Sequence, residues 1–268
     1  MERPRPPLNL PKSPLVYVVA QVNFSAVESM ATYIPDIQDR LRRKGFPRFV
    51  QGEFRAIRVT LNAPPQVTPV PRYEFQDKGR RTGVVVSKEF VTLHVSEYRT
   101  FERFCDVLST SLEIIHSVVG IGLVERVGLR YVNLVRAKGS EGFAQFLDPG
   151  LLGLDESKYG ATHSKIMSQV LGQTEIGTLA IRLFQRDDGS FLPPDAEPSP
   201  LDHPDPELGQ GEVVSLLDLD HFKLFEKAAM EFSVESVMRL FWQLHDNTDL
   251  AFRAAVTPHA LETWGRND

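Results

Sequence analysis

Residues 101–136, FERFCDVLSTSLEIIHSVVGIGLVERVGLRYVNLVR, decide the fold class of this chain. The first part of this stretch repeats apolar side chains at helical spacing, which predicts an amphipathic helix that ends at Gly120 and Gly122. Residues 123–136 then predict a long β-strand. The apolar stripe of the helix comprises Phe101, Phe104, Cys105, Leu108, Leu112, Ile115 and Val119. A long helix followed directly by a long strand indicates a sheet packed on helices.

The segment that precedes this stretch predicts more strands, arranged as an antiparallel meander. A helix is expected to begin near Pro35, because proline is tolerated in the first turn, and to end at Gly45. The proline-rich residues 63–71 predict a loop. The strands expected here are 15–24, which alternates apolar and polar side chains, 53–62, 73–76, 82–86 and 90–98.

The segment that follows opens with a loop rich in Gly, Asp and Ser at 138–158. Residues 192–211 hold six prolines and five acidic side chains, and we expect a mobile excursion that contributes nothing to a core. The remaining elements are expected as strands at 163–170, 177–185 and 212–220, a long helix capped by Ser233, and a short helix that starts at Thr257.

These elements together predict an α+β fold, with antiparallel sheet packed on long helices. A weak repeat of residues 83–135 within 163–256 suggests two similar halves, and one undivided domain is the alternative. The expected division is a flexible arm at 1–14, a first half at 15–137 and a second half at 138–268, which includes the excursion at 192–211.

Charge and cysteine content exclude several classes of protein. Thirty Lys and Arg against 35 Asp and Glu give a net charge of −5, which argues against a nucleic-acid binder. A single cysteine, Cys105, excludes an internal disulfide framework and a Cys-rich zinc site. The first apolar run, residues 15–20, is too short for a signal peptide or a membrane span, so we expect a cytoplasmic protein with no membrane partner.

No familiar catalytic motif occurs in the sequence. It lacks a Walker-type phosphate loop, a Gly-x-Ser-x-Gly elbow and His-Glu-x-x-His, and no two of its seven histidines have the spacing of a helical metal site. The expectation is therefore a protein without a catalytic residue and without a cofactor, although distant residues can still assemble a triad.

The strand at 123–136 carries candidate ligands for an anion. Arg126 and Arg130 lie on one face of this strand on either side of Gly128, a residue that allows close approach. With Arg182 from a later strand, and with Asn133, they predict a site for a carboxylate or a phosphate. The favoured alternative is structural, with these arginines paired to Glu125 or Asp218 on neighbouring positions.

A second candidate is the run from residue 216 to 223, LLDLDHFK. Asp218 and Asp220 are two residues apart on a strand, so both carboxylates face one side and could share a divalent cation. The run resembles the metal-binding strand of diguanylate cyclases, but the Gly-Gly-acid-acid-Phe turn of that family does not follow. We favour two solvent-facing acids over a metal site.

The helix that follows Ser233 is apolar around most of its circumference, so it either is buried on two sides or meets a partner. An internal role is favoured. Where a partner does bind, the candidate contact residues are Met238, Phe241 and Trp242.

Several of these features in order resemble a sporadically distributed bacterial family whose function is undefined. They are an opening Pro-Leu-Val strand at 14–16, the segment Arg126-Val127-Gly128-Leu129-Arg130-Tyr131-Val132-Asn133, and the Leu-Asp-Leu-Asp strand at 217–220. The resemblance implies an accessory role, in a defence system or a mobile element, and it assigns no catalytic residue. We expect a non-catalytic binding protein that acts through a protein partner or through self-association. A small anionic-ligand protein or enzyme that uses the arginines is the alternative.

Overall fold

The structure is a computed structural model, and it describes residues 8, 10–58, 66–137, 142–154, 158–160, 165–197, 199–225 and 229–266. Its strands are β1 (Leu15–Phe24), β2 (Arg48–Arg58), β3 (Gln66–Gln76), β4 (Thr82–Val86), β5 (Phe90–Val95), β6 (Leu123–Arg136), β7 (Met167–Gln173), β8 (Thr178–Arg186), β9 (Val214–Leu224) and β10 (Met230–Glu231). Its α-helices are α1 (Met30–Arg43), α2 (Phe101–Val119), α3 (Val234–Ala255) and α4 (Pro258–Gly265). Short 3₁₀ turns are η1 (Phe143–Gln145), η2 (Pro149–Leu151) and η4 (Pro194–Ala196).

The strands form one antiparallel sheet in the order β2-β3-β4-β5-β1-β6-β9-β8-β7, with β10 paired to β6. The predicted α+β class with antiparallel sheet is therefore confirmed. The first and last strands of this order, β2 and β7, are the edges of the sheet. β1 and β6 pair at the centre, so a single sheet runs continuously across both predicted halves, and the similarity of the halves stays a prediction.

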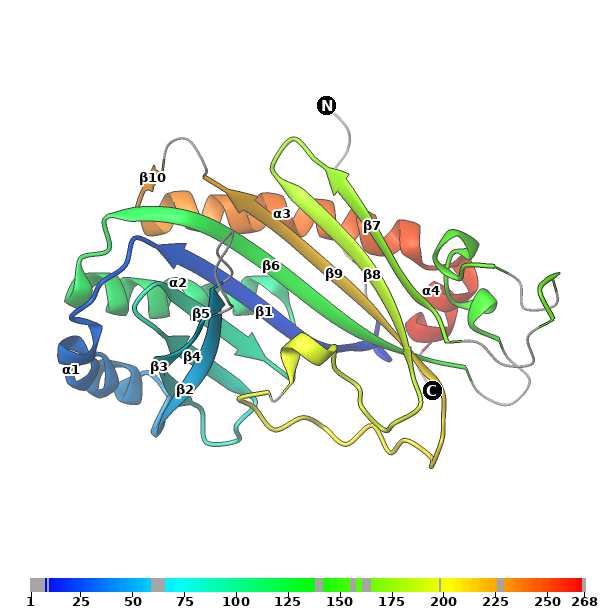
Figure 1. Cartoon of the computed structure of the whole chain (residues 1–268), viewed down its shortest axis with the longest axis horizontal. Helices are drawn as coiled ribbons and strands as arrows, with labels where there is room; N and C mark the ends of the chain where they lie inside the picture. The colour runs from blue at the N-terminus through cyan, green and yellow to red at the C-terminus, as the bar shows by residue number, and fades with distance from the viewer. Residues whose placement is uncertain are drawn as a thin grey trace.

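The helices α1, α2 and α3 lie together on one face of the sheet, behind it in Figure 1. Alternation along the strands turns apolar side chains toward them: Val18, Ala20, Val22 and Phe24 of β1 are all buried in the main core. The same core takes the predicted apolar stripe of α2 from Phe101 to Ile115. The opposite face of the sheet, turned toward the viewer in Figure 1, is called the open face below.

The helix ends follow capping rules that the sequence already indicated. The Thr100 side chain accepts a hydrogen bond from the Arg103 amide at the start of α2, and Gly120 ends the helix in the left-handed conformation at φ 70°. Ser233 caps α3 and Thr257 caps α4 in the same way. The predicted start of α1 is wrong, because the helix begins at Met30 and contains Pro35 in its interior.

The predicted loop at 63–71 is also wrong within the described residues, since β3 begins at Gln66 and contains Pro69 and Pro71. The reason is the register of the neighbouring strands. β4 pairs with β3 only from Tyr73 onward, so both prolines sit where β3 has a single hydrogen-bonded neighbour. Residues 59–62 of the strand expected at 53–62 lie outside the described residues.

The segment that follows β8 crosses the open face as a strap, defined as residues 191–197 and 199–211 and drawn from yellow-green to yellow in Figure 1. The prediction that it contributes nothing to a core is wrong. Leu192 and Leu201 are 4% and 5% exposed, and they pack with Tyr17 and Val132 of the sheet. Two apolar side chains of a proline- and acid-rich segment are therefore part of a core on the open face.

The predicted arm at 1–14 is described only at residue 8 and residues 10–14. There, Leu10 packs against the smaller core beside α4, and the Lys12 amide donates to the Trp264 carbonyl. Within the described ranges, none of the helices combines the length and apolar character that a membrane crossing needs.

Candidate functional site

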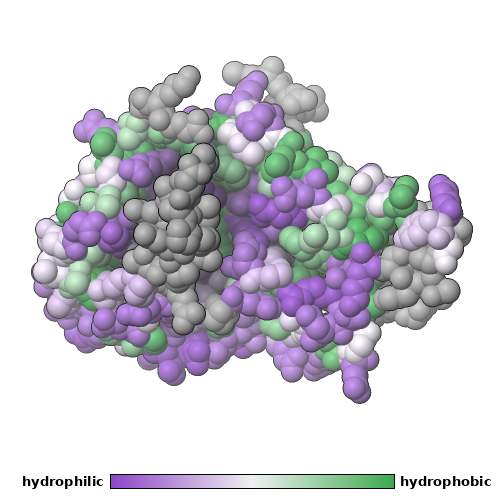
Figure 2. Space-filling view, viewed as in Figure 1, coloured by the Kyte–Doolittle hydropathy of each residue, from purple (hydrophilic) through white to green (hydrophobic). Residues whose placement is uncertain are grey.

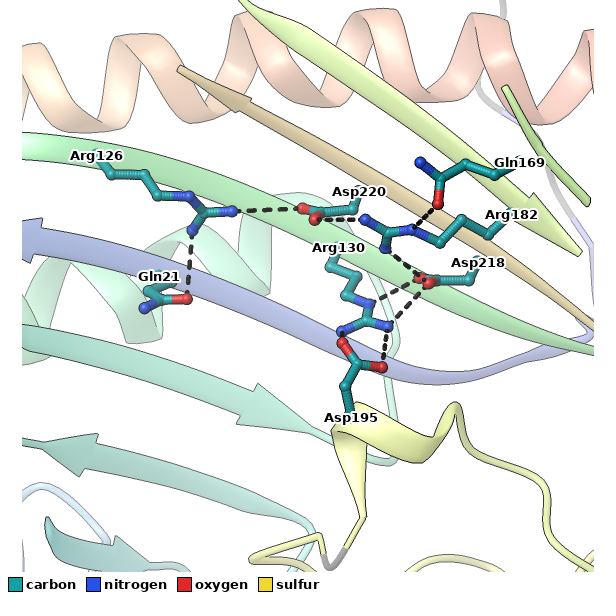
Figure 3. Close-up of polar contacts among 8 residues, drawn as sticks. All are labelled: Gln21, Arg126, Arg130, Gln169, Arg182, Asp195, Asp218 and Asp220. Carbon is teal, nitrogen blue, oxygen red and sulfur yellow. Dashed lines mark hydrogen bonds and ion pairs between the residues drawn. The ribbon is translucent and has the colours of Figure 1, made fainter. Parts of the chain in front are cut away.

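A row of charged side chains crosses the open face over three neighbouring strands, β6, β9 and β8 (Figure 3). The register places Arg130 of β6 opposite Asp220 of β9, and Asp218 of β9 opposite Arg182 of β8. Arg126 lies four residues before Arg130 on the same face of β6. The structure thus brings together all three candidate arginines and both candidate aspartates.

Arg130 is the most completely bonded member of this row. Its Nε and Nη2 donate to the two carboxylate oxygens of Asp218 at 2.7 and 2.8 Å. Its Nη1 and Nη2 donate to the carboxylate oxygens of Asp195, in η4 of the strap, at 2.8 and 2.9 Å. Burial alone would lower the pKa of Arg130, but the bonds to Asp195 and Asp218 outweigh it and hold this pKa above its usual range.

The other two arginines complete the row with longer contacts. Arg182 donates to Asp218 at 3.1 Å and lies 3.7 Å from Asp220. Arg126 lies 3.7 Å from Asp220 and donates to Gln21 at 3.3 Å. Burial raises the pKa of Asp220 despite the arginines around it.

Gly128 does allow close approach, and the group that approaches is Arg126. A Cβ atom added at Gly128 would lie 2.6 Å from Nη1 of Arg126, so the guanidinium folds back over the glycine. The same guanidinium lies over the Phe222 ring at 4.8 Å from its centroid. A side chain at position 128 would therefore displace Arg126 from Gln21.

Asn133 does not join the arginines. It is an odd number of residues from Arg130 on β6, and its side chain is buried and donates to the Leu217 carbonyl at 3.2 Å. Glu125 does not pair with the arginines of the row either, because it accepts a hydrogen bond from Ser25 instead. Asp218 is thus the predicted structural partner that Arg130 and Arg182 use.

The chemistry of the row is that of a compensated ion-pair network. Three arginines face three aspartates, and Asp218 is 0% exposed between Arg130 and Arg182. Among the described residues no group of three or more His, Cys, Asp or Glu is placed to hold a metal ion. A cation bound by both Asp218 and Asp220 would have to displace the arginines that contact these two carboxylates.

The candidate partner-binding residues on α3 differ in their exposure. Phe241 is 0% exposed within the main core, so it presents no surface to a partner. Met238 is partly buried against the same core. Trp242 is 40% exposed, and its ring packs edge-on against the Phe101 ring, with 4.7 Å between the ring centroids. Of the three, only Trp242 offers a large exposed surface.

A strand was predicted at 163–170, where the structure has β7, but its position at the edge of the sheet and its exposed apolar side chains were not predicted. Its side chains Met167, Val170 and Leu171 are 80%, 49% and 62% exposed. Within the described part of the chain, β7 pairs with β8 alone, so its other side leaves backbone N–H and C=O groups without a strand partner. Hydrophobic colour gathers over this side of the open face in Figure 2. The signal in the sequence was MSQVLGQ, seven residues without a charge or a proline.

A buried polar cluster of the open face predicts a pH dependence of stability. The His94 ring contacts the Tyr17 hydroxyl and the Thr92 hydroxyl, each at 2.6 Å, and burial lowers the pKa of His94 from 6.5 to about 3. The folded protein therefore keeps this ring neutral, while the unfolded chain takes up a proton below pH 6.5. Stability from His94 is fully present above pH 6.5 and is lost as the pH falls toward 3.

We expect the free energy of unfolding of the wild type to fall in this window by up to about 1.4 kcal/mol per pH unit more than that of His94→Gln. Urea denaturation of both proteins at a series of pH values measures the difference. Parallel pH profiles would contradict a His94 ring that stays neutral in the folded protein.

No protein-family model matches this chain, and no curated protein matches it either.

Proposed function

We propose that this protein is a non-catalytic binding protein that acts through protein association, and that β7 is the surface where a second copy of the chain docks. The observation that carries the proposal is the exposed, uncharged edge of β7. The compensated charges of the open face support the non-catalytic part, because every arginine and aspartate of the row has an opposite charge beside it. An accessory role in a bacterial system belongs to the same proposal, since such a role needs a surface and no reacting group.

Strand addition suits β7 better than the docking of a helix. The free side of an edge strand presents alternating N–H and C=O groups, and only another extended strand can bond to all of them. Natural edge strands usually carry charges or prolines that prevent such pairing. β2, the other edge, carries Arg48, Glu53, Arg55 and Arg58, whereas β7 has no charged residue.

The absence of charge favours a second copy as the occupant. When two identical strands pair about a two-fold axis, a charged residue near the axis meets its own like charge. With the axis at Val170, this residue faces its own copy, and Leu171 faces Gln169 of the second copy. Neither pair brings together like charges, so β7 is complementary to itself.

The test is the oligomeric state of the full chain, measured by light scattering after gel filtration at several concentrations. We expect a concentration-dependent dimer, because one added strand pair buries less surface than an obligate interface. Val170→Lys should be monomeric, since the two lysines would face each other. The matched control is Val50→Lys on β2, where Val50 is 46% exposed, and it should dimerise like the wild type.

A mixture of Val170→Lys and Val170→Glu should form a heterodimer, because the two charges are then opposite. A wild type that is monomeric at every concentration, with no protein co-purifying from its native host, would overturn the proposal. A dimer that Val50→Lys disrupts and Val170→Lys does not would place the interface on β2 and would also overturn it. A different protein bound at β7 would overturn the second copy as occupant while leaving protein binding as the function.

A further inference from the structure

The guanidinium of Arg130 has two edges, and each holds one carboxylate. The inner edge is bonded to Asp218 of the sheet, whose side chain is 0% exposed. The outer edge is bonded to Asp195 of the strap, whose side chain is 66% exposed. Figure 3 shows the two carboxylates on different sides of the same guanidinium. One is therefore part of the sheet, and the other is brought from a separate segment.

The inner pair orients Arg130 through contacts that belong to the sheet alone. Two bonds of 2.7 and 2.8 Å to Asp218 hold the plane of the guanidinium, so its outer N–H groups already point away from the sheet. A carboxylate that arrives at this edge finds two parallel donors in place, which is the geometry that recognises carboxylates. Little side-chain freedom remains to be lost on binding.

The charge of the sheet alone calls for one more anion. The strands contribute Arg126, Arg130 and Arg182 against Asp218 and Asp220, which leaves one positive charge uncompensated. Asp195 supplies the missing negative charge, and its bonds to Arg130 lower the pKa of its carboxyl group. The sheet therefore has a built place for one external carboxylate.

The strap is anchored on both sides of Asp195, and at Asp195 itself it is held to the sheet through Arg130. One side is held by the buried Leu192 side chain and by the Leu192 carbonyl, which accepts a hydrogen bond from Arg186 at 2.8 Å. The other side is held by the buried Leu201 side chain and by the Asp202 carbonyl, which accepts a hydrogen bond from Ser96 at 2.6 Å. Between them the short turn η4 carries Asp195 with no fully buried side chain. An exchange of carboxylates at Arg130 therefore requires η4 to move, but it leaves the Leu192 and Leu201 anchors in place.

We propose that the outer edge of Arg130 is a carboxylate-binding site that Asp195 fills from within the chain, and that an acidic side chain of another protein takes the place of Asp195 when the strap lifts. The exchange replaces one carboxylate by another on the same two donors, so it conserves both the hydrogen bonds and the charge balance. The strap then acts as an internal competitor that lowers the apparent affinity for acidic partners. This site is independent of β7 and of the oligomeric state.

The experiment measures binding of three probes to the full-length protein by calorimetry at low salt: a capped peptide of alternating Glu and Ala, succinate, and inorganic phosphate. Asp195→Ala removes the internal competitor, and we expect it to bind the peptide at least about tenfold more tightly than the wild type does. Asp202→Ala is the matched control, because Asp202 is also a strap aspartate paired with an arginine, Arg80, at 3.2 Å. It should bind like the wild type.

Asp195→Ala combined with Arg130→Lys tests whether the arginine is the receptor. Lysine keeps the positive charge but loses the two parallel donors, so the tightened binding should disappear. Asp195→Asn is the second variant if the alanine protein folds poorly, and it should bind the peptide more tightly than the wild type. Succinate should bind more weakly than the peptide if the site takes protein side chains.

Three results would overturn the proposal. The first is equal affinity of Asp195→Ala and Asp202→Ala for the peptide, which would mean that only the overall charge matters. The second is tightened binding that survives Arg130→Lys. The third is a preference for phosphate or succinate over the peptide, which would assign the site to a small anion.

Discussion

Replacing Arg130 with alanine should lower the free energy of unfolding by about 3–5 kcal/mol. The change removes the two shortest bonds of Asp218, which is 0% exposed and keeps only Arg182 at 3.1 Å. A buried carboxylate without its main partner is costly because the sheet offers it no water. Urea denaturation followed by circular dichroism measures the loss.

Two further variants show whether the loss comes from the orphaned carboxylate. The double variant Arg130→Met/Asp218→Leu removes both charges. We expect it to regain most of the free energy of unfolding that Arg130→Ala loses. Arg42→Ala removes an exposed pair to Asp39, with side chains 56% and 44% exposed, and should cost less than about 1 kcal/mol. An Arg130→Ala loss no larger than that of Arg42→Ala would contradict the network described here.

The second large effect is expected at Phe241, where alanine should cost about 3–5 kcal/mol of stability. The ring is 0% exposed in the main core, so truncation leaves a cavity between α3 and the sheet. Trp242→Ala is the control at the neighbouring position. Because the Trp242 side chain is 40% exposed, its truncation should lower the free energy of unfolding clearly less. Thermal or urea unfolding of the two variants gives the comparison.

The same pair of variants separates packing from partner contact on α3. Neither should change the dimer that we propose at β7, provided that the protein stays folded. If Phe241→Ala left stability unchanged but abolished association, the assignment of Phe241 to the core would be wrong.

The spacing of apolar residues predicted those helices and strands whose apolar side chains are also the ones buried in the structure. The strands at 82–86 and 123–136 were predicted with the bounds that the structure has, because turns and glycines mark both of their ends. Alternation also placed Arg126 and Arg130 on one face. The same rule would have excluded Asn133 from their site, since three residues separate it from Arg130 and odd separations change the face of a strand.

The remaining features depend on contacts between distant segments, which no local pattern contains. The strap is polar in sequence, yet Leu192 and Leu201 find buried places because the sheet leaves its open face uncovered by helices. Likewise, the exposure of β7 follows from its position at the end of the strand order, and a single strand's sequence does not specify that position. Asp195 could not be linked to Arg130, because 65 residues separate them.

Association through β7 is tested most directly by hydrogen–deuterium exchange of this strand. The exchange of residues 167–173 is measured by mass spectrometry below and above the concentration at which the chain dimerises. We predict slower exchange of 167–173 in the concentrated sample, unchanged exchange of residues 48–53 in β2, and no slowing in Val170→Lys. Exchange of 167–173 that stays equally fast at both concentrations, or protection that develops in β2 instead, would contradict the account.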